Sequence, residues 1–149
     1  MKSRTRARGI ALQALYEMDL STHLPGDILN NRLEASQLDP THADFARSII
    51  FGVIKLIPDL DLTIAKHAPE WPLDQVAIID RNILRIALWE MIFDPSTPIK
   101  VVINEAIELA KLFGSDATPR FVNGVLGSLV DNQNEIRQFF EKKKDLITE

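Results

Sequence analysis

The sequence predicts an all-α fold of about seven helices, arranged as two small helical bundles that share a core. Glycine and proline divide the 149 residues into segments, and inside these segments apolar residues recur at three- and four-residue steps. This is the period of an amphipathic helix. No segment alternates apolar and polar residues as a half-buried strand would. Short connections between helices are typical of bundles.

In the first half of the chain, the apolar spacing predicts helices over residues 3–20, 27–37, 42–57 and 60–68. Asp39 or Thr41 can cap the third of these by accepting a hydrogen bond from its first amides. Pro58 should end or kink that helix, because proline lacks an amide hydrogen and its ring crowds the preceding turn. HAPEWP, at residues 67–72, marks the expected boundary between an N-terminal lobe (about 1–70) and a C-terminal lobe (about 71–149).

In the second half, helical segments are expected over residues 73–78, 81–93, 98–113, 119–131 and 136–149. Asp80 is the expected N-cap of the second segment. Two others begin with Thr-Pro, at 97–98 and 118–119, where threonine can cap and proline suits the first helical position. Gly114 is expected to end its helix with a positive φ. Asn-Gly at 123–124 is typical of hairpins, but the apolar spacing continues through it and predicts helix.

Composition excludes several classes of protein. Cysteine is absent, so the chain has no disulfide framework or thiolate metal site. No apolar run is long enough to cross a membrane, and no signal peptide is recognisable, so we expect a cytoplasmic protein. The histidines at 23, 42 and 67 have no second ligand at helical spacing. No nucleotide-binding or hydrolase motif is present. We therefore expect no metal, cofactor or enzymatic activity; Glu105 and Glu108 share a helix face but are more typical of a solvated charge pair.

The N-terminus is strongly cationic in an acidic chain. Lys2, Arg4, Arg6 and Arg8 precede the first acid, Glu17, and the remaining residues hold 13 cations against 21 acids. We call residues 2–8 the leader. A body with this charge repels nucleic acid in general, so binding would be confined to the leader and would favour a short single strand.

The leader continues into the first predicted helix, on which Gln13 and Tyr16 follow the same polar side. Cations can hold phosphates, the Gln13 amide can bond a base edge, and Tyr16 can stack on an unpaired base. Gly9 would let a backbone approach closely. The alternative is a solvated tail with no ligand.

A second candidate surface lies on the helix over residues 98–113. Val101 and Leu112 fall outside its expected buried face, on the side that carries Glu105 and Glu108. These four residues could dock a basic partner. The alternative is that another helix of the bundle covers them.

Four stretches together resemble the NusB family. They are RxxALQALY near the start, LRIALWE at 84–90, TPIKVVINEAIELAKLFG at 97–114 and RFVNGVLGSL at 120–129. Their order and spacing match the family over essentially the whole chain, although residues 21–75 match only by helical pattern.

The resemblance implies an all-helical, two-lobed RNA-binding transcription antitermination factor. Such proteins recognise the single-stranded boxA element of ribosomal RNA leaders together with the ribosomal protein NusE, in a complex with RNA polymerase. The same domain also occurs fused to ribosomal RNA cytosine methyltransferases, so an RNA-targeting domain of that kind is one alternative. A helical protein-interaction module with a passive tail is another. Members could also form a homodimer through the leader face.

Carried over to this sequence, the resemblance implies RNA contacts at Lys2, Arg4, Arg6, Arg8, Gln13, Tyr16, Arg120 and Phe121. The last two depend on the later helix starting beside the leader. It places the NusE surface on the middle and later helices, with Trp89, Glu90, Val101, Glu105, Glu108 and Leu112 as candidates. Asn123 and Gly124 are expected to serve helix packing. Thr5 interrupts a run that is often more densely basic, and Gly9 stands where a larger residue is common; these departures imply weaker RNA binding by the chain alone.

Overall fold

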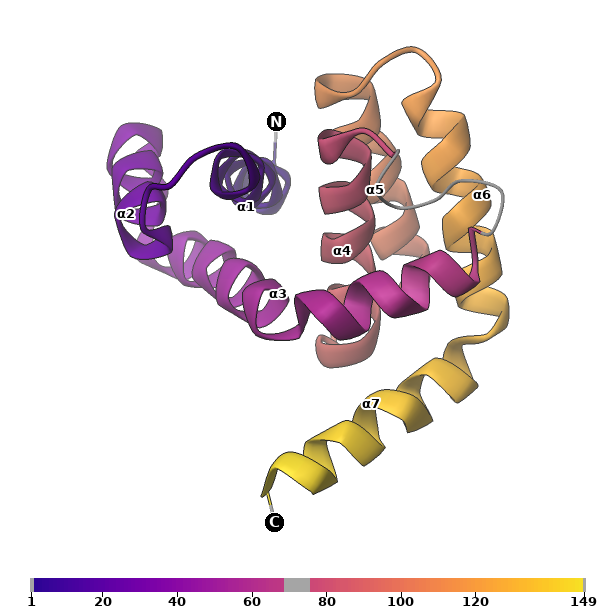
Figure 1. Ribbon diagram of the computed structural model, residues 1–149. Helices are drawn as coiled ribbons and strands as arrows, with labels where there is room; N and C mark the ends of the chain where they lie inside the picture. The colour runs from indigo at the N-terminus through magenta and orange to yellow at the C-terminus, as the bar shows by residue number, and fades with distance from the viewer. Residues whose placement is uncertain (1, 69–75, 149) are drawn as a thin grey trace.

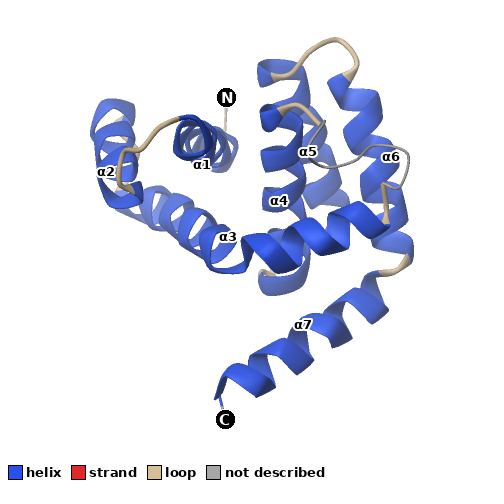
Figure 2. Cartoon of the chain, viewed as in Figure 1, coloured by secondary structure: helices blue, strands red, loops and turns tan. Residues whose placement is uncertain are grey.

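The computed structural model describes residues 2–68 and 76–148. Every regular element in these ranges is an α-helix (Figure 2), which confirms the predicted fold class. The helices are α1 (Ser3–Leu20), α2 (Pro25–Ser36), α3 (Pro40–Lys66), α4 (Ile78–Phe93), α5 (Ile99–Phe113), α6 (Thr118–Asp131) and α7 (Gln133–Thr148). The predicted lobe boundary and most of the short piece predicted over 73–78 lie outside the described residues.

The helices surround one continuous apolar core. Figure 1 shows α1 between α2 and the group formed by α4, α5 and α6, with α3 crossing beneath both sides and α7 apart from α1. Each helix contributes buried apolar side chains to the same cluster, for example Leu12, Ile28, Ile50, Leu84, Leu109, Leu126 and Phe140. None of the helices in the described part is long and apolar enough to cross a membrane.

α3 joins two segments that were expected to be separate. It runs without interruption from Pro40 to Lys66 with Pro58 inside it, and Figure 1 shows it as a bent helix. Proline removes one backbone hydrogen bond and displaces a carbonyl of the preceding turn, so a bend is the expected result. Of the two predicted outcomes, a kink is the one that occurs.

The helix caps agree with the sequence pattern only at α3, where the Asp39 carboxylate accepts from the His42 amide at 3.0 Å. The predictions for Asp80, Thr97 and Thr118 are wrong. α4 already begins at Ile78, so Asp80 lies in its first turn. The Thr97 and Thr118 hydroxyls instead donate to carboxylates outside their helices, Asp94 at 2.8 Å and Asp80 at 2.9 Å respectively.

The glycines also differ from expectation. Gly114 ends α5 with a φ of −93°, not a positive one; a Cβ there would lie 2.5 Å from the Cβ of Thr118, so close approach is what requires glycine. α6 runs through Asn123 and Gly124 as predicted. Both are exposed, and a Cβ on Gly124 would meet nothing within 4 Å. Helix packing therefore does not explain this pair.

Candidate nucleic-acid interface

All of the leader except Lys2 lies in the first two turns of α1, and contacts with other helices hold these turns in place. Lys2 directly precedes the helix, whereas Arg4, Arg6 and Arg8 lie within it. Residues four apart share a helix face, so Arg4 and Arg8 point toward α4 and α5 while Arg6 points toward α2. The three arginines accordingly have different partners.

Arg8 is buried and forms the strongest of these contacts. Its side chain is 2% exposed, and its Nε and Nη2 donate to the two carboxylate oxygens of Glu90, each at 2.8 Å. Its Nη1 lies 3.5 Å from the Glu105 carboxylate. A bidentate, charge-assisted pair of this kind has both strength and fixed geometry. The prediction that Arg8 faces a phosphate chain is therefore wrong, and so is the prediction that Glu90 docks a partner, because Glu90 is equally buried.

Arg4 is held at the surface and remains 48% exposed. Its guanidinium carbon lies 3.8 Å from the centre of the Phe45 ring, and Nη2 lies 3.6 Å from the Asp94 carboxylate. Burial raises the pKa of Asp94, but hydrogen bonds from Ser96 and Thr97 and the charge of Arg4 outweigh it and lower the pKa overall. Asp94 is thus ionised at neutral pH and keeps Arg4 in place without covering it.

Arg6 is exposed and contacts the end of α2. Its Nη2 donates to the carbonyl oxygen of Ser36 at 2.6 Å. The last carbonyls of a helix lack internal partners and carry partial negative charge, so a cation there is favourable. The contact fixes the direction of Arg6 and leaves its remaining N–H groups available.

Gln13 and Tyr16 continue the polar side of α1 as predicted, but Gly9 does not. Tyr16 is exposed, and Gln13 is half-buried and accepts a hydrogen bond from Arg32 of α2 at 3.2 Å. Gly9 is buried, and a Cβ there would lie 3.4 Å from the Phe113 ring. Phe113 therefore covers part of the Gly9 backbone, but Gly9 still lines a groove between α1, α2 and α5, and the approach of a ligand to it stays a prediction. Arg32 was not anticipated, because a lone arginine in a weakly periodic helix looks like a solvated residue.

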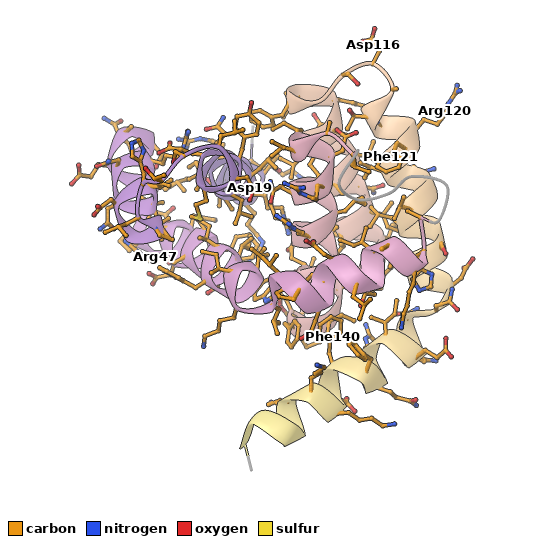
Figure 3. The ribbon with its side chains drawn as sticks, viewed as in Figure 1. Asp19, Arg47, Asp116, Arg120, Phe121 and Phe140 are labelled. Carbon is orange, nitrogen blue, oxygen red and sulfur yellow. The ribbon has the colours of Figure 1, made fainter. Side chains whose placement is uncertain are left out.

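Arg120 and Phe121 lie in the first turn of α6, away from the leader. The Thr118 hydroxyl ties this turn to Asp80 at the start of α4, where burial raises the pKa of Asp80 against the opposing hydrogen bond. The leader contacts the other end of α4, at Glu90. Ten helical residues span about 15 Å, so the expectation that α6 starts beside the leader is wrong. Figure 3 shows Arg120 pointing outward from α6.

The far end of α1 does reach the start of α4. The Asp19 carboxylate, near the C-terminus of α1, accepts from Arg81 and Arg85 of α4, both at 3.2 Å. α1 therefore extends from the leader, past Gln13 and Tyr16, to the end of α4 that adjoins the first turn of α6. The candidate RNA contacts form a path along α1 and not a single cluster.

The candidate docking strip on α5 is exposed in part. Val101 is 39% exposed and Leu112 is 45% exposed, which confirms that they lie outside the buried face and shows that no described helix covers them. Glu108 is also exposed. Glu105 differs, because it accepts from the Thr5 hydroxyl at 3.1 Å and lies beside Arg8. Trp89 is half-buried, with its indole against Gly52 of α3.

The three histidines lie apart. His23 and His42 contact acids nearby in the sequence, Glu17 and Asp39 respectively, whereas His67 contacts Ser128 of α6. Within the described ranges, no group of three or more metal-ligating side chains is close enough together to hold an ion.

Known proteins resemble this chain over most of its length. The model of the NusB family matches residues 5–131. The transcription antitermination protein NusB of Roseiflexus castenholzii is 47% identical over 134 residues, covering 89% of this chain and 94% of that protein. The protein of the same name from Bacillus pumilus is 42% identical and covers 93% and 99% respectively.

Solved structures agree with these sequence matches. NusB of T. maritima is 31% identical with a TM-score of 0.77, over 91% of this chain and 90% of that one. A complex of the antitermination factors NusB and NusE with double-stranded RNA contains a chain that is 27% identical with a TM-score of 0.77, over 93% and 98%. With matches to the family model and to relatives that are 42% and 47% identical across nearly the whole length, the chain belongs to the NusB family.

Proposed function

We propose that this protein is an RNA-binding transcription antitermination factor that recognises the boxA element of ribosomal RNA leader transcripts together with the ribosomal protein NusE. The relatives are named as antitermination proteins, and a structurally similar NusB was solved with NusE and RNA. The observation that carries the proposal is the cationic leader held at the surface of α1 on an otherwise acidic chain.

Phosphates are bound by the exposed part of the leader. Lys2, Arg4 and Arg6 face solvent, and contacts with Asp94, Phe45 and the end of α2 restrain the two arginines before any ligand arrives. Restraint lowers the entropy that must be lost when RNA binds. Arg8 acts indirectly: its pair with Glu90 fixes the rotation of α1, and with it the direction of the other cations.

The bases are read further along α1. The exposed ring of Tyr16 offers a face on which an unpaired base can stack, and Gln13 offers an amide for a base edge. Arg120 and Phe121, at the start of α6, provide a second contact region for a strand that follows α1 toward the start of α4. A flexible single strand can follow such a path.

NusE is proposed to bind the acidic body. The exposed strip of Val101, Glu108 and Leu112 on α5 combines apolar and acidic groups, which suits a basic ribosomal protein. The strip adjoins α1, so NusE and RNA would lie side by side. The complete assembly includes RNA polymerase and acts in the cytoplasm, and the role of this chain is binding without a catalytic step.

The proposal is tested by fluorescence anisotropy with a labelled boxA RNA, with and without NusE. Binding should be weak with the chain alone and much tighter with NusE, since each ligand adds surface for the other. Arg4→Ala/Arg6→Ala should weaken it strongly. The matched control Lys55→Ala/Lys142→Ala removes two exposed cations from α3 and α7 and should have little effect. Equal affinity for a scrambled RNA in the presence of NusE would overturn the proposal.

A further inference from the structure

A groove of about 350 Å³ lies between α1, α2 and α5, directly beside the leader. Among its lining residues are Arg6, Gly9, Gln13, Arg32, Leu112 and Phe113. We propose that it holds one base of the bound RNA and selects a base that carries a carbonyl oxygen, and not an amino group, at position 4 of a pyrimidine or position 6 of a purine, namely uracil or guanine. This inference rests on the proposed function and adds base selectivity to it.

The apolar part of the groove suits a flat ring. Phe113 packs against the backbone of Gly9, and Leu112, at 45% exposed, is the neighbouring apolar side chain of α5. Covering part of this exposed leucine with a base lowers the free energy of the complex. Leu112 lies where the groove meets the strip proposed for NusE, so the base and NusE would meet at this side chain. The volume is within the range of small-molecule sites and exceeds what a single base needs. A base can enter while its phosphates stay with the leader, because Arg6 belongs to both.

Arg32 decides which way the Gln13 amide points. The Arg32 Nη1 donates to Gln13 Oε1 at 3.2 Å, and Nη2 donates to Glu17 Oε1 at 3.0 Å. A guanidinium has only donors, so the amide oxygen must face Arg32 and the NH₂ group is left for a ligand. The His23 hydrogen bond and the contact with Arg32 lower the pKa of Glu17 against an opposing effect of burial, so Glu17 is ionised and holds Arg32 in this position.

The polar groups of the groove are consequently donors. Arg6, the Gln13 NH₂ group and Arg32 all donate, and Arg32 Nε is buried without any hydrogen bond, so donors exceed acceptors at this point. The two lining hydroxyls donate to the protein itself, Ser36 to a backbone carbonyl at 2.8 Å and Thr5 to a carboxylate at 3.1 Å, and the Ser36 oxygen also accepts from the Leu38 amide at 3.3 Å. The Thr5 oxygen keeps acceptor capacity, against the several N–H groups of Arg6, Gln13 and Arg32. Uracil and guanine present carbonyl oxygens where cytosine and adenine present amino groups. If the base carried an amino group here, that amino group and the facing donor of the groove would both lack a hydrogen-bond partner.

The test compares the octamers rU8 and rC8, which carry the same charge and differ in the base only at positions 3 and 4, in anisotropy titrations with NusE present. The chain should bind rU8 about tenfold more tightly than rC8, the size expected when a hydrogen bond is replaced by two facing donors. Gln13→Glu puts an acceptor where the NH₂ group was and should bring the ratio to one or below. Lys2 does not line the groove and is proposed to bind phosphates only, so Lys2→Ala should weaken the binding of both octamers equally.

Equal affinity of the unmodified chain for the two octamers would overturn the inference, as would an unchanged ratio in Gln13→Glu. If the octamers still bind and Arg4→Ala/Arg6→Ala still weakens them, the proposed function survives that result. Failure to bind either octamer or boxA RNA would overturn both.

Discussion

The pair between Arg8 and Glu90 allows a sharp test of the structural role assigned to Arg8. Both side chains are 2% exposed. Arg8→Met keeps most of the apolar stem but leaves the Glu90 carboxylate buried without its bidentate partner. Removing one member of a buried ion pair costs about 3–5 kcal/mol of unfolding free energy, because an uncompensated charge stays inside. For a chain of this size that corresponds to a fall in Tm of roughly 6–20 °C.

The double variant Arg8→Met/Glu90→Leu distinguishes this explanation from simple loss of packing. With both buried charges removed and the volume filled, most of the lost stability should return. The part that does not return is the contact between Arg8 and Glu105, which is 19% exposed and keeps its hydrogen bond from Thr5. Urea unfolding of the unmodified chain, of Arg8→Met and Glu90→Leu singly and of the double variant, monitored by circular dichroism, gives the four free energies needed for a double-mutant cycle.

RNA binding provides the second measurement. If Arg8 acts only by holding α1 against α4, the folded double variant should bind boxA RNA with NusE as tightly as the unmodified chain. The reasoning fails if the double variant is stable and well folded but has lost RNA affinity, since Arg8 would then contact RNA itself. It also fails if Arg8→Met alone leaves stability unchanged.

Three further predictions concern packing, charge and salt. Gly52→Ala should destabilise by about 1–3 kcal/mol in thermal unfolding, because its Cβ would lie 2.2 Å from the Trp89 indole, whereas Gly127→Ala, with nothing within 4 Å, should stabilise by about 0.5–1 kcal/mol. Asp39→Ala should be less stable than the unmodified chain at neutral pH; since the His42 amide lowers the Asp39 pKa below 3.8, the difference should vanish as the pH falls through that lowered value in acid titrations of stability. With three exposed leader cations, the log–log salt slope of single-strand binding should be about −2.1; about −2.8 would show that a fourth engages.

Sequence periodicity predicted where helices form but not how their ends are made. The apolar spacing depends on residues three and four apart, so it identified α1 to its last residue and carried α6 through Asn123. A cap depends on a side chain reaching one particular amide, and tertiary contacts can redirect it. The Thr118 hydroxyl bonds Asp80, which lies 38 positions earlier, and no local pattern shows this. Pro58 illustrates the same limit, because core packing on both sides keeps α3 continuous.

For the candidate site, the sequence indicated which part of the chain is cationic but not which cations are accessible. Arg4, Arg6 and Arg8 have the same side chain and lie close together in the sequence. The fold shows that Arg8 is buried and that the other two are exposed. Glu90 looked like a docking residue for the same reason. The sequence does show that many acids follow the leader. It does not show which of them pairs with a leader arginine, because Glu90 lies 82 residues after Arg8 and no local spacing connects the two.

Under the proposed function, the acids beside the leader also give a physical reason for a second protein. Lys2 and the three leader arginines add four positive charges, while Glu90, Asp94 and Glu105 place three carboxylates within 3.6 Å of two of those arginines. At physiological ionic strength, charges farther than about 8 Å are largely screened. RNA near the leader therefore meets these four cations and three carboxylates, which together carry a net charge of about +1. Such a field orients a strand but attracts it weakly. Under the proposed function, tight and selective binding must therefore come from contacts along α1 together with surface that NusE adds, and the leader's main contribution is to set the direction in which the RNA enters.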